Sequence, residues 1–308
     1  MAIMTRTSAA SAPPSGNLYA VEGRRLALCR AGEGGPAVVF LPGAGLIGLD
    51  FLNVHQEIAG HTTSVLYDRG GTGWSDPVRL PRTATEVAQE LRGLLEVADI
   101  PPPYVLVGHS LGGAYARRFA QLFAADIAGL VMLDPAHEGY AAIPGPNLAA
   151  QFRQALGLLP LLAGPARFYR SLFRRMFACW PEGLRETLVD YHLRAWSRSL
   201  QEAKTLQTEV FEELRAGGAL PDVPMIVLAA MGIDPFMAPF ASTASLMGLN
   251  ARKHEIYAAF AASTPQGELR TLENAGHSTL HTDRPDAVIG AILDVAALTP
   301  PARSARRA

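Results

Sequence analysis

Short runs of apolar residues alternate along the chain with longer segments in which apolar residues recur at every third or fourth position. Continuous apolar runs are typical of strands in a parallel sheet that is covered on both faces. We expect such strands at 37–41, 64–67, 104–107, 130–133 and 225–228, with a weaker one at 268–272. Residues 18–29 predict two further strands, joined by a tight turn at Glu22 and Gly23.

Helical periodicity fills most of the gaps between these runs. Thr83 and Glu86 form the S/T-x-x-E pattern of a capping box, and the apolar residues that follow fall on one helical face as far as Val97. Helices are also expected at 111–126 and 283–298. Because strands that alternate with helices need crossover connections, the pattern predicts an α/β fold, with a mostly parallel, eight-stranded sheet and helices on both faces.

The stretch between Asp134 and Met225 breaks this alternation, since it is rich in Leu, Phe, Arg and Ala and contains no clear strand. A connection of that length needs structure of its own, so we expect a helical lid. The predicted organisation is a flexible tail at 1–16, a core formed by 17–138 and 222–299, a helical lid at 139–221 and a second flexible tail at 300–308.

Composition narrows the function classes. The formal net charge is -1 and 49% of the residues are hydrophobic, which gives no electrostatic reason to expect nucleic acid and enough apolar surface for a large core. Two cysteines, no secretory leader and no long apolar run favour a cytoplasmic protein without a transmembrane segment or a disulfide framework. We expect a monomer or homodimer that acts on a small molecule.

Cofactor motifs are not apparent in the sequence. Gly70 to Gly73 do not have the spacing of a dinucleotide fingerprint, and neither a phosphate-binding loop nor a cluster of metal ligands is found. We therefore expect neither a cofactor nor a metal.

The sequence Gly108-His109-Ser110-Leu111-Gly112 carries the clearest chemical signal. It matches G-x-S-x-G with a predicted strand before it and a predicted helix after it. A serine on such a sharp turn projects its hydroxyl clear of the sheet, and the start of the helix favours negative charge beside it. Ser110 is therefore the expected nucleophile.

A serine hydroxyl needs a base, and that base needs an orienting carboxylate. His277 follows the last predicted strand and precedes the last helix, so it should reach the same edge of the sheet as Ser110. Two carboxylates follow neighbouring strands at that edge. Asp234 is favoured as the acid and Asp134 is the alternative; the one not used should accept backbone N–H groups instead.

The remaining site residues are predicted from their positions in loops. The oxyanion hole should use the backbone N–H groups of Leu111 and of Ala44, which lies between two glycines after the strand at 37–41. His137 comes just after a strand and could line the substrate pocket, and His109 lies within the serine turn. The ring of His109 is expected to pack beside that turn, and both histidines are candidates for contact with the substrate.

These motifs resemble the α/β-hydrolase superfamily over nearly the whole chain. The G-H-S-L-G-G stretch is similar to its nucleophile elbow, and the segment from Tyr67 to Ser75 is similar to its glycine-rich turn. His277 falls where the family has its histidine. Asp234 matches the usual family acid, although it lies farther from His277 than is typical, and Asp134 matches the position that some lipase-like members use. Many members have His-Gly where this chain has Pro42-Gly43.

The resemblance implies a serine esterase or lipase-like enzyme that works through an acyl-enzyme intermediate. The apolar lid segments at 156–162 and 168–177 suggest small or medium apolar acyl groups, although such residues also pack a lid onto its core. Serine as the nucleophile argues against the family's epoxide hydrolases and dehalogenases. The alternatives are a non-hydrolytic enzyme on the same fold, such as a lyase, perhydrolase or acyltransferase, and a ligand-binding receptor.

Overall fold

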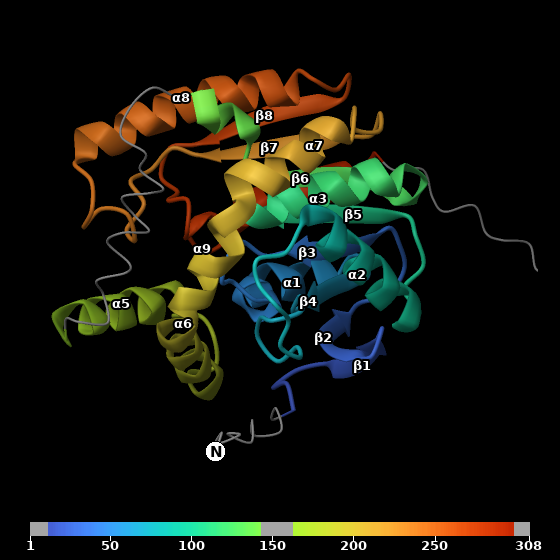
Figure 1. Ribbon diagram of the computed structural model, residues 1–308, viewed down its shortest axis with the longest axis horizontal. Helices are drawn as coiled ribbons and strands as arrows, with labels where there is room; N and C mark the ends of the chain where they lie inside the picture. The colour runs from blue at the N-terminus through green and yellow to red at the C-terminus, as the bar shows by residue number, and fades with distance from the viewer. Residues whose placement is uncertain (1–11, 143–162, 299–308) are drawn as a thin grey trace, which may run out of the picture.

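The computed structural model describes residues 12–142 and 163–298 and is built around one eight-stranded sheet (Figure 1). The strand order is β1-β2-β4-β3-β5-β6-β7-β8; β1 and β2 run antiparallel to their neighbours, and the others are parallel. The strands are β1 (Asn17–Val21), β2 (Arg24–Ala31), β3 (Ala37–Leu41), β4 (Ser64–Tyr67), β5 (Tyr104–His109), β6 (Ile127–Leu133), β7 (Met225–Ala230) and β8 (Gly267–Leu272). The predicted strands are therefore confirmed, and so is the hairpin turn at Glu22 and Gly23, where both residues have positive φ.

Every residue of the five strands β3 to β7 is buried, whereas the edge strand β8 is buried only in part. The continuous apolar runs are explained by this double coverage, because side chains on both faces of a central parallel strand leave water. β8 has one neighbour and keeps Arg270 and Glu268 half exposed in an ion pair, so its sequence is more mixed.

Helices cover both faces of the sheet and create two separate cores. One face carries α2 (Ala84–Val97), α3 (Leu111–Leu122), α7 (Phe211–Ala216) and α8 (Thr243–Ala261); the other carries α1 (Leu52–Ala59) and α10 (Pro285–Ala297). Leu91, Phe119 and Tyr257 belong to the first core, and Ile58 and Ile292 to the second. This arrangement places all loops that follow the parallel strands at one edge of the sheet.

The helix boundaries agree in part with the sequence pattern. α2 begins with the predicted capping box, in which Thr83 Oγ1 accepts from Glu86 N at 3.1 Å and Glu86 Oε2 accepts from Thr83 N at 2.9 Å. The helix expected at 111–126 ends at Leu122 and is followed by the short 3-10 helix η2 (Ala124–Asp126). The one expected at 283–298 is divided at Arg284 into α9 (Leu280–Asp283) and α10, because Pro285 begins a new helix.

The stretch expected to be a lid is mostly helical where the structure describes it, and its described residues contain no strand. It contains η3 (Glu138–Ala142), α5 (Ala163–Met176), α6 (Glu182–Glu202), η5 (Ala203–Thr205), the π-helical turn η6 (Leu206–Val210) and α7. Figure 1 shows α5 and α6 projecting to one side of the sheet. Residues 143–162, including the apolar stretch 156–162, lie outside the described part, as do 1–11 and 299–308 of the predicted tails.

Most of the apolar side chains of the 168–177 segment are used for packing. Leu172, Met176 and Phe177 are buried, while Phe168 remains 42% exposed. Two arginines of α5 pair with acidic residues of α6: Arg170 binds Asp190 at 2.8 Å and Arg174 binds Glu186 at 2.8 Å. α5 and α6 therefore form a helical pair with an apolar inner side. Within the described ranges, none of the helices has both the length and the apolar character needed to cross a membrane.

The capping box of α2 predicts a measurable loss of stability. Thr83→Ala removes the side-chain acceptor of the Glu86 N–H and should lower the free energy of unfolding by about 1 kcal/mol. Gln89→Ala, an exposed change on the same helix, should stay within about 0.5 kcal/mol of the parent. Urea unfolding monitored by circular dichroism measures both; equal effects of the two substitutions would contradict the assignment.

Candidate active site

Ser110 stands between the end of β5 and the start of α3 in a backbone conformation that side chains rarely adopt. Its φ is 52° and its ψ is -121°. The surrounding backbone imposes this conformation: Ser110 N–H donates to Leu133 O at 3.1 Å, and its carbonyl accepts from Gly113 N and Ala136 N. Such strain persists only where several bonds hold it, and these bonds come from the neighbouring strand and from α3 itself.

Two glycines around Ser110 are required by close backbone approach. A Cβ at Gly112 would lie 1.9 Å from Leu41 O, and one at Gly108 would lie 2.7 Å from Gly113 Cα. Both distances are shorter than any side chain tolerates. The G-x-S-x-G spacing therefore follows from the packing of the first turn of α3 against β3 and β5.

Ser110, His277 and Asp134 form a continuous hydrogen-bonded chain. Ser110 Oγ lies 3.1 Å from His277 Nε2, and His277 Nδ1 lies 2.5 Å from Asp134 Oδ2. The three residues come from the turn after β5, the loop between β8 and α9, and the end of β6. The Asp134 side chain is 1% exposed and that of His277 is 39% exposed. The carboxylate of this hydrogen-bonded series is thus buried in protein, whereas the imidazole is partly exposed.

Asp134 has two more partners besides the imidazole. Its Oδ1 accepts from Ala230 N at 2.8 Å, and Lys253 Nζ lies 2.9 Å from Oδ1 and 3.1 Å from Oδ2. Burial alone would raise the pKa of Asp134, but the charge of Lys253 and the hydrogen bond with His277 outweigh it and lower the pKa to about 2. The carboxylate is therefore ionised throughout the neutral range.

Asp234, the carboxylate that the sequence favoured as partner of His277, is placed differently. Its Oδ1 accepts from Phe236 N at 2.8 Å and Met237 N at 3.0 Å, and its Oδ2 accepts from Ser278 N at 2.5 Å. It caps the turn after β7 and holds the backbone directly after His277. The carboxylate at the ring is Asp134, the alternative, and the structural role expected for the unused acid is the one observed for Asp234.

The loop after β3 is oriented by a buried ion pair. Arg69 donates to Pro42 O at 2.8 Å and to Gly43 O at 2.6 Å, and its guanidinium pairs with Glu202 of α6 at 2.6 Å. Glu202 also accepts from Gly45 N at 2.7 Å. Both charged side chains are 2% exposed.

This pair determines which way the Ala44 N–H points. In a trans peptide, the C=O of one residue and the N–H of the next point in opposite directions. Because Gly43 O is turned toward Arg69, the Ala44 N–H is turned away from it. A Cβ on Gly43 would lie 3.1 Å from Ser110 Cβ, so the loop and the serine are immediate neighbours. The Leu111 N–H is at the first turn of α3, where helical N–H groups lack intrahelical partners.

Comparison with known proteins identifies the family of this chain. The model of the alpha/beta hydrolase family matches residues 38–291. The chain belongs to the alpha/beta hydrolase family. Uncharacterized protein YqjL of Bacillus subtilis is 37% identical to it over 107 residues, which are 35% of this chain and 42% of YqjL. The chain thus aligns with less than half the length of that relative.

Two further relatives of this alpha/beta hydrolase extend over most of its length. A pimeloyl-acyl-carrier-protein methyl ester esterase of Xanthomonas oryzae is 27% identical over 268 residues, which are 81% of this chain and 92% of that protein. A thermophilic esterase from Thermogutta terrifontis superimposes with a TM-score of 0.61 at 20% identity, over 90% of this chain and 96% of the esterase. At that identity the second likeness is one of fold.

The histidines expected to contact substrate have other partners in this hydrolase. His109 is 2% exposed and its Nε2 lies 2.9 Å from His277 O. Its ring centroid lies 6.1 Å from that of Phe51 and 6.0 Å from that of His281, and those two rings are themselves in contact. Burial lowers the pKa of His109 to about 3, so its ring is neutral. The His109 ring packs beside the serine turn, as expected, and its contact with substrate stays a prediction.

His137 faces α8. Its Nδ1 accepts from Gly139 N at 3.0 Å, and its ring centroid is 5.0 Å from that of Phe260. Its contact with substrate stays a prediction.

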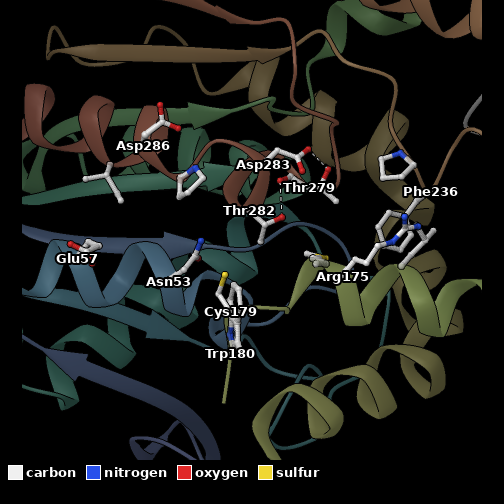
Figure 2. A pocket seen from close by; sticks show the side chains of 15 residues that line it. Asn53, Glu57, Arg175, Cys179, Trp180, Phe236, Thr279, Thr282, Asp283 and Asp286 are labelled. Carbon is white, nitrogen blue, oxygen red and sulfur yellow. Dashed lines mark hydrogen bonds between the residues drawn. The ribbon is translucent and has the colours of Figure 1, made fainter. Parts of the chain in front are cut away.

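A cavity of about 670 Å³ lies between α1, α5 and the start of α10 (Figure 2). It adjoins the loop between β8 and α9, which carries His277. Its wall includes Thr279, two residues after His277, and Phe236, two residues after Asp234. Of the residues that the structure describes, those of the hydrogen-bonded chain itself do not line it. Figure 2 shows Thr279 bound to Asp283 at its rim, which fixes the backbone of the loop. The cavity therefore adjoins the site without containing the reacting atoms.

Sequence reasoning missed three charged residues: Lys253, Arg69 and Glu202. α8, which carries Lys253, was not predicted, and that helix also accounts for the unusual separation of Asp234 from His277. A signal was present, since Lys253 shares one helical face with Asn250 and Tyr257, and an isolated lysine on a buried face needs a partner. Nothing local to Glu202 marks it as the partner of a residue 133 positions away.

The Arg69–Glu202 pair predicts a large effect on stability. Glu202→Gln leaves the guanidinium buried without a counter-charge, and should lower the free energy of unfolding by about 3–5 kcal/mol. Glu182→Gln on the same helix, where the side chain is 86% exposed, should change it by less than about 0.5 kcal/mol. Urea unfolding of both variants measures the difference, and similar small changes in both would rule out a tightly held pair.

Proposed function

We propose that the protein is a serine hydrolase that cleaves carboxylic esters of small or medium apolar acyl groups through an acyl-enzyme intermediate. The observation that carries this proposal is the chain of hydrogen bonds from Ser110 Oγ through His277 to Asp134. Nucleophile, base and orienting carboxylate at such distances are the arrangement that acyl transfer requires.

In the first half of the proposed reaction, Ser110 is the nucleophile and His277 is the base. Ser110 Oγ attacks the ester carbonyl carbon while its proton passes to His277 Nε2, and the carbonyl oxygen becomes an oxyanion. The N–H groups of Leu111 and Ala44 are the proposed donors to that oxyanion, and the start of α3 adds favourable potential. Collapse of the intermediate breaks the bond to the alcohol oxygen, which takes the proton from His277. The alcohol leaves and the acyl group stays on Ser110.

The second half regenerates the enzyme. A water molecule gives a proton to His277 Nε2 and attacks the acyl carbon. The bond between that carbon and Ser110 Oγ then breaks, Oγ takes the proton back from His277, and the carboxylic acid leaves. Asp134 holds the ring through Nδ1 in both halves, so that Nε2 faces Ser110 and the transient imidazolium has a counter-charge. The ester named for the Xanthomonas oryzae relative supports the choice of carboxylic esters as substrates.

We infer that α5 and α6 form the cover of the site. α6 contacts the loops after β3 and β4 at several points: Ser199 Oγ donates to Ala44 O at 2.9 Å, Tyr191 OH accepts from Gly73 N at 2.9 Å, and Glu202 binds Gly45. These loops lie at the edge of the sheet where Ser110 stands. A cover in this place would exclude water and provide the apolar surface that an acyl chain needs.

Ester cleavage that depends on Ser110 tests the proposal. The protein should release p-nitrophenol from esters with short and medium acyl chains, and Ser110→Ala should lower the rate by at least about a thousandfold. A fluorophosphonate probe should label Ser110 in the parent protein, as seen by mass spectrometry of the modified peptide. Ester release that is unchanged in Ser110→Ala, or the lack of any release or labelling in the folded parent, would contradict the assignment.

The two aspartates give a matched pair of variants. Asp134→Asn should lower kcat by about three to four orders of magnitude, because an amide cannot hold the required tautomer or balance the imidazolium. Asp234→Asn keeps one of the two acceptor oxygens for the backbone N–H groups and leaves the Asp134 carboxylate at the ring, so it should lower kcat by less than about tenfold. Steady-state kinetics with a p-nitrophenyl ester distinguish the two, and a greater loss in Asp234→Asn would return the role to that residue.

A further inference from the structure

Lys253 is a buried ammonium group in direct contact with the carboxylate that holds His277. The residue is 5% exposed, and Nζ lies 2.9 Å from Asp134 Oδ1 and 3.1 Å from Oδ2. Nζ also donates to Ala230 O at the end of β7. A lysine is rarely buried to this degree, and each of its observed contacts is with the immediate surroundings of Asp134.

The position of Lys253 is fixed by its neighbours on α8. Asn250, one turn before, donates to Met231 O at 2.7 Å, and Tyr257, one turn after, donates to Pro135 O at 2.8 Å. These bonds attach α8 to the ends of β7 and β6, the strands whose final residues surround Asp134. The attachment of α8 to these two strands thus fixes the position of the Lys253 ammonium group.

The charges around the imidazole come from several elements. β5 contributes His109, which is neutral; β6 contributes Asp134; the loop after β7 contributes Asp234, which binds Ser278 N; and α8 contributes Lys253. On the His277 side, α9 provides the buried ring of His281, whose pKa burial lowers, and Asp283, which accepts from Gly276 N at 3.0 Å. The cation in contact with Asp134 is Lys253.

The positive charge of Lys253 changes how strongly the Asp134 carboxylate favours a protonated His277 ring. A buried carboxylate without another partner strongly favours a protonated imidazole as its counter-ion, since an unpaired charge in the interior is costly. Here the carboxylate already has a cation, and a proton on the ring would bring a second positive charge close to the first. The pair should therefore keep the ring available as a base down to lower pH.

We propose that Lys253 is a positioning residue that sets the pH range over which His277 acts as a base, by neutralising the Asp134 carboxylate from behind. The inference rests on the proposed function insofar as the ring serves Ser110. The arrangement has a cost, because the same cation weakens the support that Asp134 gives to the transient imidazolium. Lys253 thus extends activity toward acid pH at some expense in the maximum rate.

Substitution of Lys253 tests the effect of its charge. In Lys253→Met, which keeps most of the alkyl chain, the acid limb of the kcat/KM profile for a p-nitrophenyl ester should move up by about one to two pH units. The plateau at high pH should remain within about tenfold of the parent value. Lys253→Arg, which retains the charge, should move the limb by less than half of the Met shift. Arg252→Met removes an exposed cation from the same helix and should leave the limb in place.

Several results would overturn the proposal. An acid limb that does not move in folded Lys253→Met, or that moves equally in Lys253→Arg, would mean that Lys253 only fills space. Lys253→Gln, which can still donate hydrogen bonds, serves as the second uncharged variant and should shift the limb as Met does. Loss of folding in both uncharged variants would assign Lys253 to stability alone and would equally reject the proposal.

A measurement without turnover separates this inference from the proposed function. The ring signals of His277 can be followed by NMR against pH, with His277→Asn to assign them. Their titration midpoint should rise in Lys253→Met relative to the parent and stay in place in Arg252→Met. That shift is expected whether or not esters are substrates, whereas Ser110→Ala kinetics address the substrate class alone. An unchanged midpoint would reject the role of Lys253.

Discussion

The interaction on which the site depends is the one between the buried carboxylate of Asp134 and the three groups that surround it. Ala230 N–H, the Lys253 ammonium and the His277 ring belong to β7, α8 and the loop after β8, so one side chain at the end of β6 connects four parts of the chain. The contacts form only when the parallel strands are in register, because β6 and β7 must end side by side. The register of the sheet therefore also sets the geometry of the hydrogen bonds from Asp134 to His277 and Ser110.

A second buried charge pair performs a comparable task at the other side of Ser110. Arg69 binds two carbonyl groups of the loop after β3 and is itself held by Glu202. The guanidinium acts through backbone direction, since turning Gly43 O one way turns the Ala44 N–H the other way. In both places the ionic groups stand behind the atoms that would meet a substrate. They fix peptide planes and ring orientation, which is what the proposed role of Ser110 as a nucleophile would require of its surroundings.

Much of this was predictable from sequence where the signal is local. The apolar runs gave the strands, because a strand covered on both faces allows few polar residues, and the capping box gave the start of α2 to the residue. Ser110 and His277 followed from their positions after strands. The choice between Asp134 and Asp234 could not be made, since both lie at strand ends on the same edge and differ only in which carboxylate reaches the ring. Lys253 and Glu202 act across long separations, and no local pattern announces such partners.

The Arg69–Glu202 pair also has a mechanical consequence. It joins the Ala44 loop to α6 through charges that water does not reach, so helix and loop behave as one body. Any agent that lifted α6 away from the sheet would have to strip Arg69 of its counter-ion or carry residues 42–45 along with the helix. Under the proposed mechanism, either movement would take away one of the two N–H groups that bind the carbonyl oxygen of the ester. The proposed cover and one of the proposed donors would then move together, so that opening the site would also switch off its chemistry.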